Sequence, residues 1–258
     1  MVKKRRKRSV KVLAADKELL KKIRLLKAEH PFWGYRRIWA YLRFVKGLLI
    51  NKKRVYRLLK ENNLLVKKNL KLKAQRRSSQ SKPRPVRANQ WWGVDMTKAM
   101  TNSGWAYIVL VVDWHTKKVV GHFCGEQSKS WHWLAALNKA VNWQFPRGIR
   151  EAAFELNLMS DNGSQPTSHS FMQACAALGI KQAFTAYNNP KGNADTERMI
   201  RTLKEELVWL REWQSVEELK TALDEFVESF NEQYLHSSLG YKTPNQFEKE
   251  QMILNLAA

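Results

Sequence analysis

Seven apolar residues in a row run from Ala106 to Val112. An uninterrupted apolar run of this length, rich in β-branched residues, is typical of a buried strand. Shorter strand patterns stand on both sides of it, at residues 92–97 and 119–124, and residues 115–118 form a turn before the second of these. Three consecutive strands joined by tight turns predict an antiparallel meander.

The segments that follow alternate between helix and strand. Apolar residues three or four positions apart predict helices, and short apolar runs predict two further strands. The expected elements are a helix over 130–143, a strand over 154–159, a helix over 168–178, a strand over 180–184, and helices over 195–213 and 216–233. The order β-β-β-α-β-α-β-α is that of the ribonuclease-H-like α/β fold, a mixed five-stranded sheet flanked by helices. In that fold the first strand is central and the fourth lies beside it, which would bring Asp95 and Asp161 close together.

Positive charge is concentrated in the front third of the chain. The net charge is +23 over 258 residues; residues 1–88 hold 30 Lys and Arg against 4 Asp and Glu, whereas residues 89–258 hold 16 against 19. A charge of this size and sign points to a polyanionic partner, most simply nucleic acid. The remainder has the balance of an ordinary domain, and a hydrophobic content of 44% supplies a core.

Cysteines and hydropathy restrict the remaining classes. Cys124 and Cys175 fit neither a metal-ligand spacing nor a disulfide framework, so we expect reduced core thiols. No run of about 18 apolar residues is present, which predicts no membrane span. The basic residues Lys3 to Arg8 are followed by no apolar stretch of signal type, so they do not indicate secretion. We expect a cytoplasmic, nucleoid-associated protein.

The front third predicts a small helical domain. A helical period begins at Lys17 and ends at Pro31, a second amphipathic helix follows Gly34, and Asn51 is placed to cap a third. Three short helices with a turn between the last two fit a helix-turn-helix, with the third as the recognition helix. The expected domains are a basic N-terminal arm, 1–16; a helix-turn-helix domain, 17–66; a basic linker, 67–90; and a catalytic core, 91–250.

Cations occupy the outward positions of the last two of these helices, while Val55, Leu58 and Leu59 face inward. We expect these cations to contact DNA, and phosphate contact is better supported than base readout. The alternative is a basic bundle that only packs on the rest of the chain. The DNA-binding candidates are Arg36, Arg37, Lys52, Lys53, Arg54 and Arg57.

Three acidic residues stand where strands end or a helix begins. Asp95 lies in the first strand, Asp161 follows the fourth, and Glu197 opens the long helix after 35 intervening residues. On a helical wheel, Glu197, Arg201 and Lys204 share one stripe. The adjoining stripe, expected to face the core, is formed by Ile200, Leu203, Leu207 and Leu210. By itself the charged stripe would be a surface face with an ion pair between Glu197 and Arg201. Together with the other two acids it predicts a site that holds divalent metal against a phosphodiester.

Other polar and aromatic residues are given structural roles. Asp113 is interpreted as a turn acid at a strand end, and Asp195 as a helix cap. Trp209 and Trp213, near the end of the long helix, are assigned to packing on a partner subunit. The scattered histidines interpreted as structural are His122, His132 and His169.

Several stretches around the three acids resemble the integrase-core (DDE) transposases of bacterial insertion sequences. They are SDNGSQ at 160–165, PKGNADTER at 190–198, RTLKEEL at 201–207 and HSSLGYKTP at 236–244. The likeness covers about residues 17–250 and is to the second-frame product of elements made from two overlapping frames. Two departures leave the acids untouched: residues 231–236 lack the Arg-Pro pair common in the family, and Pro166 stands where an aromatic is commoner.

The resemblance implies a transposase that cleaves DNA strands at the ends of its element and transfers them to a target. It implies that Asp95, Asp161 and Glu197 are catalytic and hold Mg²⁺ or Mn²⁺, as two ions. The partners it implies are double-stranded DNA, further copies of the chain and the upstream-frame product. Further DNA contacts are expected from Lys191, Arg201 and Lys204.

Three other interpretations stay open at this point. One is a nuclease of the same fold that cuts without joining. Another is a DNA-binding regulator in which the acids are vestigial. A third is a partial transposase subunit that is inactive without the upstream-frame product, because this chain has no leucine heptad run.

Overall fold

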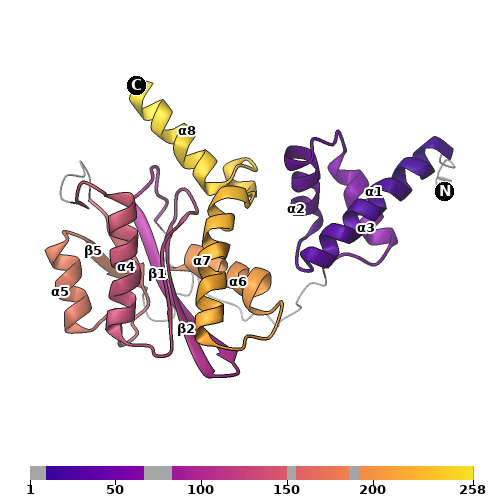
Figure 1. Ribbon diagram of the computed structural model, residues 1–258. Coiled ribbons are helices and arrows are strands. Elements are labelled where there is room, and N and C mark those ends of the chain that lie inside the picture. The colour runs from indigo at the N-terminus through magenta and orange to yellow at the C-terminus, as the bar shows by residue number, and fades with distance from the viewer. Residues whose placement is uncertain (1–9, 67–82, 150–154, 186–191, 258) are drawn as a thin grey trace, which may run out of the picture. The chain divides into compact units, whose positions relative to one another are not determined.

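A computed structural model of the chain describes residues 10–66, 83–149, 155–185 and 192–257 (Figure 1). It divides into two compact units, residues 1–74 and 75–258. The division falls inside the segment expected to be a linker. Within the described residues, no helix is both long and apolar enough to cross a bilayer.

The N-terminal unit is built from three helices around one core. They are α1 (Val10–Glu29), α2 (Tyr35–Ala40), which continues into a π-helical turn (Tyr41–Val45), and α3 (Lys52–Glu61). The Asn51 side chain accepts a hydrogen bond from the Lys53 backbone N–H at 2.8 Å, which confirms the predicted cap. The fully or nearly fully buried residues include Ile23, Ile38, Leu42, Val55 and Leu59.

Helix α1 begins earlier than the sequence pattern indicated. It starts at Val10, so the predicted boundary of the arm at residue 16 is wrong for residues 10–16. Within this stretch, Asp16 is buried and pairs with two arginines of α3, so the packed part of α1 begins at least one residue before the predicted start at Lys17.

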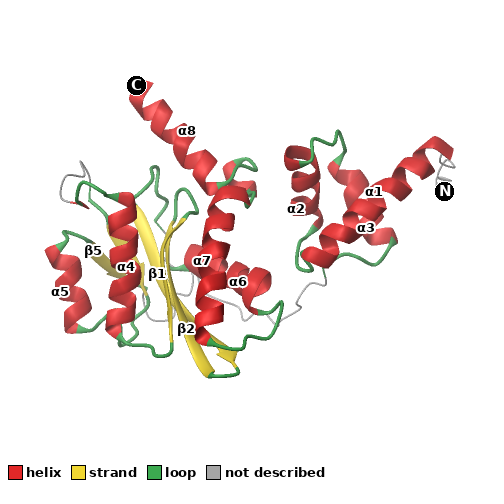
Figure 2. Cartoon of the chain, viewed as in Figure 1, coloured by secondary structure: helices red, strands yellow, loops and turns green. Residues whose placement is uncertain are grey.

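The second unit contains a five-stranded mixed sheet in the order β3-β2-β1-β4-β5. Figure 2 shows its strands in yellow among the helices of this unit. Strands β1 (Trp91–Thr101), β2 (Gly104–Asp113) and β3 (Val119–Gly125) are antiparallel neighbours. Strands β4 (Asn157–Ser160) and β5 (Lys181–Phe184) continue the sheet in parallel from β1. The predicted meander, the central first strand and its fourth-strand neighbour are all confirmed.

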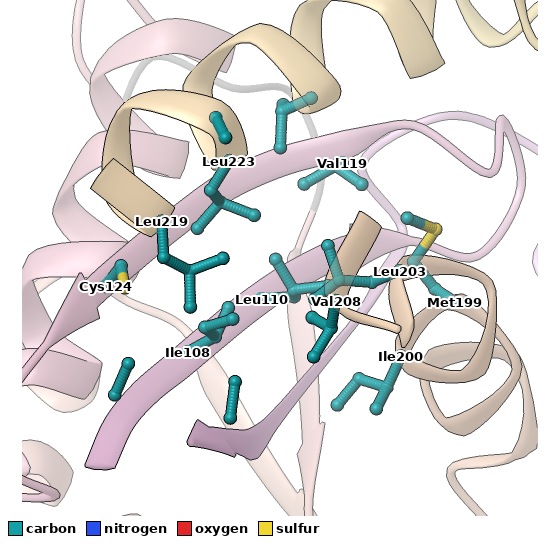
Figure 3. Close-up of a cluster of buried hydrophobic side chains, with 14 of the residues drawn as sticks. Ile108, Leu110, Val119, Cys124, Met199, Ile200, Leu203, Val208, Leu219 and Leu223 are labelled. Atoms are coloured by element: carbon teal, nitrogen blue, oxygen red, sulfur yellow. The ribbon is translucent and has the colours of Figure 1, made fainter. Parts of the chain in front are cut away.

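Helices cover both faces of this sheet. On one face lie α4 (Ser130–Gln144) and α5 (His169–Ala177), and on the other α6 (Ala194–Leu203) and α7 (Val216–Gln233). Alternate residues of β2 point into the two hydrophobic cores on opposite faces of the sheet. Both faces of the strand are therefore buried, which explains its continuous apolar run. Val109 and Val111 pack with α4, whereas Ile108 and Leu110 pack with α6 and α7 (Figure 3).

The end of α6 departs from the expected wheel. A π-helical turn (Lys204–Val208) follows Leu203, and the helix is not continued to residue 213. A π-turn carries one more residue per turn than an α-helix, so the inward positions shift. Val208 is 9% exposed and joins the core, whereas Leu210, predicted to be core, is 43% exposed. Trp213, predicted to meet a partner subunit, is instead buried within this unit.

Two further segments differ from the prediction. Residues 83–90, expected to be linker, are attached to the core, since the buried Asn89 donates its backbone N–H to Asp113 at 2.6 Å and accepts from Trp92 Nε1 at 3.0 Å. A last helix, α8 (Pro244–Ala257), was not predicted and leads away from the sheet (Figure 1). A buried pair between Lys118 and Glu248, 2.6 Å apart, holds the first part of α8.

Candidate active site

Asp95 occupies the middle of the central strand. Its residue partner in β2 is Leu110, and its carboxylate Oδ1 accepts a hydrogen bond from the Met96 backbone N–H at 2.8 Å. Residues two apart in a strand face the same side, and Ala99 lies in the core under α6 and α7. The Asp95 side chain therefore projects to the face of the sheet that α6 covers.

Asp161 reaches the same place through the pairing of β4 with β1. The parallel register pairs Trp91 with Asn157 and Gly93 with Met159. Carried two residues further, this register puts Asp161, directly after β4, alongside Asp95. The exposed Asp161 carboxylate accepts the backbone N–H of Gly163 at 3.0 Å, which orients it in the tight turn after the strand.

Glu197 comes from the first turn of α6, which packs against β1. Its backbone N–H bonds to the carbonyl of the N-cap residue Asn193 at 3.0 Å. The Glu197 side chain is exposed. A carboxylate in the first turn is also favoured by the partial positive charge of a helix N-terminus.

Asp161, Glu197 and Lys204 each lie near enough to Asp95 for their charges to act on its carboxyl group. The pKa of Asp95 is raised to about 6, first because the carboxyl is buried and further because of the negative charges of Asp161 and Glu197. The positive charge of Lys204 acts in the opposite direction. Two of the predicted acids and one predicted cation therefore act on the third acid, Asp95. In the part of the chain that the structure describes, no three acidic, histidine or cysteine side chains form a ready-made metal cage.

Two further cations, Arg201 and Lys191, were expected to contact DNA beside the site. Arg201 is exposed and pairs with Glu205 at 2.8 Å, one turn further along. Lys191 lies outside the described residues. Of the two cations of the predicted stripe, Arg201 and Lys204, it is Lys204 whose charge acts on Asp95.

The DNA-binding candidates of the N-terminal unit fall into two groups. Arg36 and Lys53 are exposed, Arg37 is half-buried over the Trp33 ring, and the Lys52 ammonium lies 4.2 Å from the centre of the Trp39 ring.

Arg54 and Arg57 contradict the expectation that they stay outside. Arg54 Nε and Arg57 Nη2 each lie 2.7 Å from a different carboxylate oxygen of the buried Asp16. These two arginines hold α1 against α3, and their side chains are only 31% and 27% exposed.

The acids set aside as structural are satisfied within the fold. Asp113 is buried and accepts hydrogen bonds from the Asn89, His115 and Thr116 backbone N–H groups, which confirms it as a turn acid. Asp195 is not the cap of α6, because the N-cap is Asn193 and Asp195 instead pairs with Lys117 at 3.3 Å.

Two of the three histidines assigned a structural role are buried, as are both cysteines, whereas His169 is exposed at the start of α5. His122 is buried and bonds to Asp224 at 2.6 Å, and His132 is buried and stacks on Phe123. Both cysteines are free and buried, as predicted, and burial raises the pKa of each thiol to about 12.

One group beside the site was missed from the sequence. Gly93, Asn193 and Thr196 are buried where α6 meets β1, and Trp114 reaches them from the end of β2. The only sequence signal was Gly93 itself, since a glycine inside a strand often marks close approach of another segment.

Comparison with known families accounts for both units. Two family models described as "Integrase core domain" match residues 85–190 and 178–244, and one described as "HTH-like domain" matches residues 14–71. The two integrase-core matches together span more than half of the chain. The chain belongs to the integrase-core family, whose enzymes are polynucleotidyl transferases.

Within that family, the similarity extends over both units to insertion-element transposases. "Transposase InsD for insertion element IS2A/D/F/H/I/K" of Escherichia coli is 26% identical over 243 residues, which cover 90% of this chain and 78% of that protein. The corresponding transposase of the element on the F plasmid of strain K12 gives the same values. A chain of the simian T-cell lymphotropic virus intasome in complex with PP2A regulatory subunit B56 gamma shares the fold, with a TM-score of 0.52 and 18% identity over 81% of this chain and 73% of that one.

Proposed function

We propose that this chain cleaves DNA strands at the ends of an insertion sequence and transfers the freed ends to target DNA. The reacting site is formed by Asp95, Asp161 and Glu197. The observation that carries the proposal is the convergence of these acids from a central strand, a strand end and a helix start, seen in the charge that Asp161 and Glu197 impose on Asp95. The similarity to insertion-element transposases along 90% of the chain supports the same activity.

The donor set fits divalent metal. Three carboxylates offer hard oxygen ligands, which suit Mg²⁺ or Mn²⁺ and not a thiolate metal. Burial, and after it the negative charges of Asp161 and Glu197, raise the pKa of Asp95, and a bound cation would relieve the repulsion between these charges. We propose that Asp95, Asp161 and Glu197 hold two such ions. Bound there, the ions supply Lewis acidity and activate water or a 3′-hydroxyl for attack on the phosphodiester.

The protein's own side chains hold and orient the substrate. Asp95 is fixed by its strand, and Asp161 by the turn that donates the Gly163 N–H. Lys204 places a positive charge beside the acids, where it can pair with a phosphate of the strand being cut. Because only the nucleophile differs between hydrolysis and joining, one set of side chains can serve both steps.

The N-terminal unit supplies affinity for the DNA. We propose that the exposed cations Arg36 and Lys53, with Lys52 and Arg37, contact the phosphate backbone, in line with the HTH-like match. Arg54 and Arg57, whose side chains are 31% and 27% exposed, are proposed as weaker DNA contacts because both are paired with Asp16. Lys191 and Arg201 are proposed as contacts beside the active site. Further copies of the chain and the upstream-frame product are the proposed protein partners.

The test is a strand-transfer assay with a labelled, pre-cleaved duplex that carries the element's own end. Asp95→Asn, Asp161→Asn and Glu197→Gln should each reduce joining by at least about 10²–10³-fold, as expected when a group that stabilises transition-state charge is lost. Each variant should bind the duplex like the wild type in a gel-shift measurement. Glu217→Gln, which changes an exposed acid on α7, is the matched control and should join normally.

The same assay separates the alternatives. Cleavage without any joined product would identify a nuclease. Joining at the wild-type rate by Glu197→Gln would overturn the assignment of this acid to the reacting site. A wild type that binds the duplex but neither cleaves nor joins it would overturn the proposal and favour a DNA-binding regulator. Activity that appears only after the upstream-frame product is added would identify a partial subunit.

A further inference from the structure

Glu197 is the acid whose position depends most on packing. Asp95 is held within a strand paired on both sides, and Asp161 follows a strand directly. Glu197 instead stands in the first turn of a ten-residue helix, where hydrogen bonding within the helix is incomplete. Whatever fixes that turn against β1 therefore fixes the third carboxylate.

Two buried hydrogen bonds fix it. The indole Nε1–H of Trp114 donates to the hydroxyl of Thr196 at 3.0 Å, and Thr196 precedes Glu197. The amide Nδ2 of Asn193, the N-cap residue, donates to the Val94 carbonyl at 3.2 Å, and Val94 precedes Asp95. Trp114, Thr196 and Asn193 are 1%, 0% and 3% exposed, so water does not compete for these bonds.

Trp114 is in turn held by β1. Its backbone N–H donates to the Trp91 carbonyl at 3.0 Å, and its ring stacks on the Trp91 ring with the centres 5.7 Å apart and the planes 8° from parallel. The donor that reaches Thr196 is therefore anchored to the same strand that carries Asp95.

Gly93 makes room for this arrangement. A Cβ at this position would lie 1.9 Å from Thr196 Oγ1, 2.4 Å from Trp114 Nε1 and 2.7 Å from Asn193 Oδ1. All three distances are far inside van der Waals contact, so any side chain would push α6 away from the strand. Gly93 lies two residues before Asp95 and faces the same side of the sheet. The closest approach of α6 to β1 is thus one step along the strand from the catalytic aspartate.

We infer that Trp114, Thr196 and Asn193 are positioning residues that set Glu197 against Asp95 for metal binding, with Gly93 as the clearance they need. The inference rests on the proposed function for its catalytic consequence. None of the four touches the reacting atoms. Their effect passes through the placement of α6, as hydrogen-bond partners orient the ligands of other metal sites.

Thr196→Val tests the inference in the full-length chain. Valine keeps the shape of threonine but cannot accept the indole N–H. The affinity for Mn²⁺, measured from free Mn²⁺ by electron paramagnetic resonance, should fall about 10–100-fold, and the strand-cleavage rate at saturating DNA should fall by a similar factor. The KM for DNA should not change. Thr196→Ser retains the hydroxyl and should keep both the affinity and the rate.

Trp114→Phe provides a second variant, because it removes the donor and leaves an aromatic ring to stack on Trp91. It should reproduce the losses of Thr196→Val, and the double variant should be no worse than either single one, since both remove the same bond. Thermal unfolding of each variant shows whether it is folded. Gly93→Ala should also weaken Mn²⁺ binding, by displacing α6.

The outcomes keep the two proposals apart. A wild type that cleaves, with Thr196→Val and Trp114→Phe equal to it in Mn²⁺ affinity and rate, overturns the positioning role alone. A wild type that binds Mn²⁺ in a Thr196-dependent way but does not cleave overturns the proposed function and supports the positioning role. A wild type that neither binds Mn²⁺ nor cleaves overturns both.

Discussion

Asp95 is placed where it costs stability. A carboxyl group buried beside two other acids is harder to ionise than one in water, and the pKa of about 6 reflects this cost. A folded chain without metal has to carry the charge or a proton. The same repulsion would favour the divalent cation that we propose for this site, so the proposed function comes at a cost in stability.

Asp95→Asn should therefore stabilise the metal-free protein at neutral and higher pH. The folded pKa, about 6, exceeds the ordinary value of 3.8, so the wild type loses stability as pH rises between these values and keeps the full penalty above pH 6. The shift corresponds to about 3 kcal/mol. Urea unfolding should show Asp95→Asn more stable than the wild type at pH 8 and equal to it near pH 3.5. A variant that is no more stable at pH 8 would contradict the raised pKa.

Asp16 is a buried acid with the opposite character. Burial opposes its ionisation, but hydrogen bonds and charges from Arg57 and Arg54 lower its pKa overall. Asp16→Asn should destabilise the N-terminal unit by about 1–3 kcal/mol, the cost of leaving charged hydrogen-bonding groups unmatched. Glu18→Gln, in an exposed pair with Lys21, is the control and should change little. Thermal unfolding of the full chain and, separately, hydrogen exchange of the backbone amides in α1 and α3 measure the difference. Equal amide protection in Asp16→Asn and Glu18→Gln would refute the prediction.

At the scale of elements, local patterns predicted the order of helices and strands but not their long-range contacts. The run over β2 and the Asn51 cap follow from nearest-neighbour chemistry, and both were confirmed. The inward turn of Arg54 could not be predicted, because its partner Asp16 lies 38 residues away in the sequence. The position of Leu210 was wrong because a wheel assumes regular α-helix and cannot anticipate a π-turn.

For the site, too, part of the arrangement could be predicted from the sequence, whereas the long-range contacts could not. Asp95 and Asp161 were predicted to meet because the expected fold places their strands side by side, and the register of β1 with β4 confirms that arrangement. The hydrogen bond from Trp114 to Thr196 joins residues 82 apart in the sequence, so no local sequence pattern could predict it.

The π-turn after α6 predicts that Val208 contributes more to the stability of the core than Leu210 does. Val208→Ala should destabilise the protein by about 1–2.5 kcal/mol, because it removes buried methyl groups beside Leu203. Leu210→Ala removes a larger side chain but one that is 43% exposed, so its cost should be smaller. Denaturant unfolding measures how much stability each of the two variants loses. A larger loss for Leu210→Ala would mean that the helix continues regularly and that the wheel was right.

In the molecule as a whole, the excess positive charge and the acids of the proposed site lie in different parts of the sequence. The front third carries 30 basic and 4 acidic residues, while the remainder is close to neutral and holds the acids of the site. We therefore propose that DNA affinity depends mainly on the basic front third and metal binding on the carboxylates of the second unit. Affinity and catalysis should then respond to different substitutions.

Salt dependence tests this division. The logarithm of the DNA affinity should fall linearly with the logarithm of salt concentration, with a slope of about −0.9 for each phosphate contacted. Replacing both Arg36 and Lys53 with glutamine should make the slope shallower by about 2. Lys220→Gln, which changes a cation already paired with Glu217, is the control and should leave the slope unchanged. An identical slope in the double variant would remove these two residues from the DNA contacts.

The most direct test of the central claim is anomalous X-ray scattering from crystals of the full-length chain soaked in Mn²⁺. The account predicts anomalous density between the carboxylates of Asp95, Asp161 and Glu197, and its loss in crystals of Asp95→Asn. Density at another place, or none under conditions in which the same protein cleaves DNA with Mn²⁺, would contradict it.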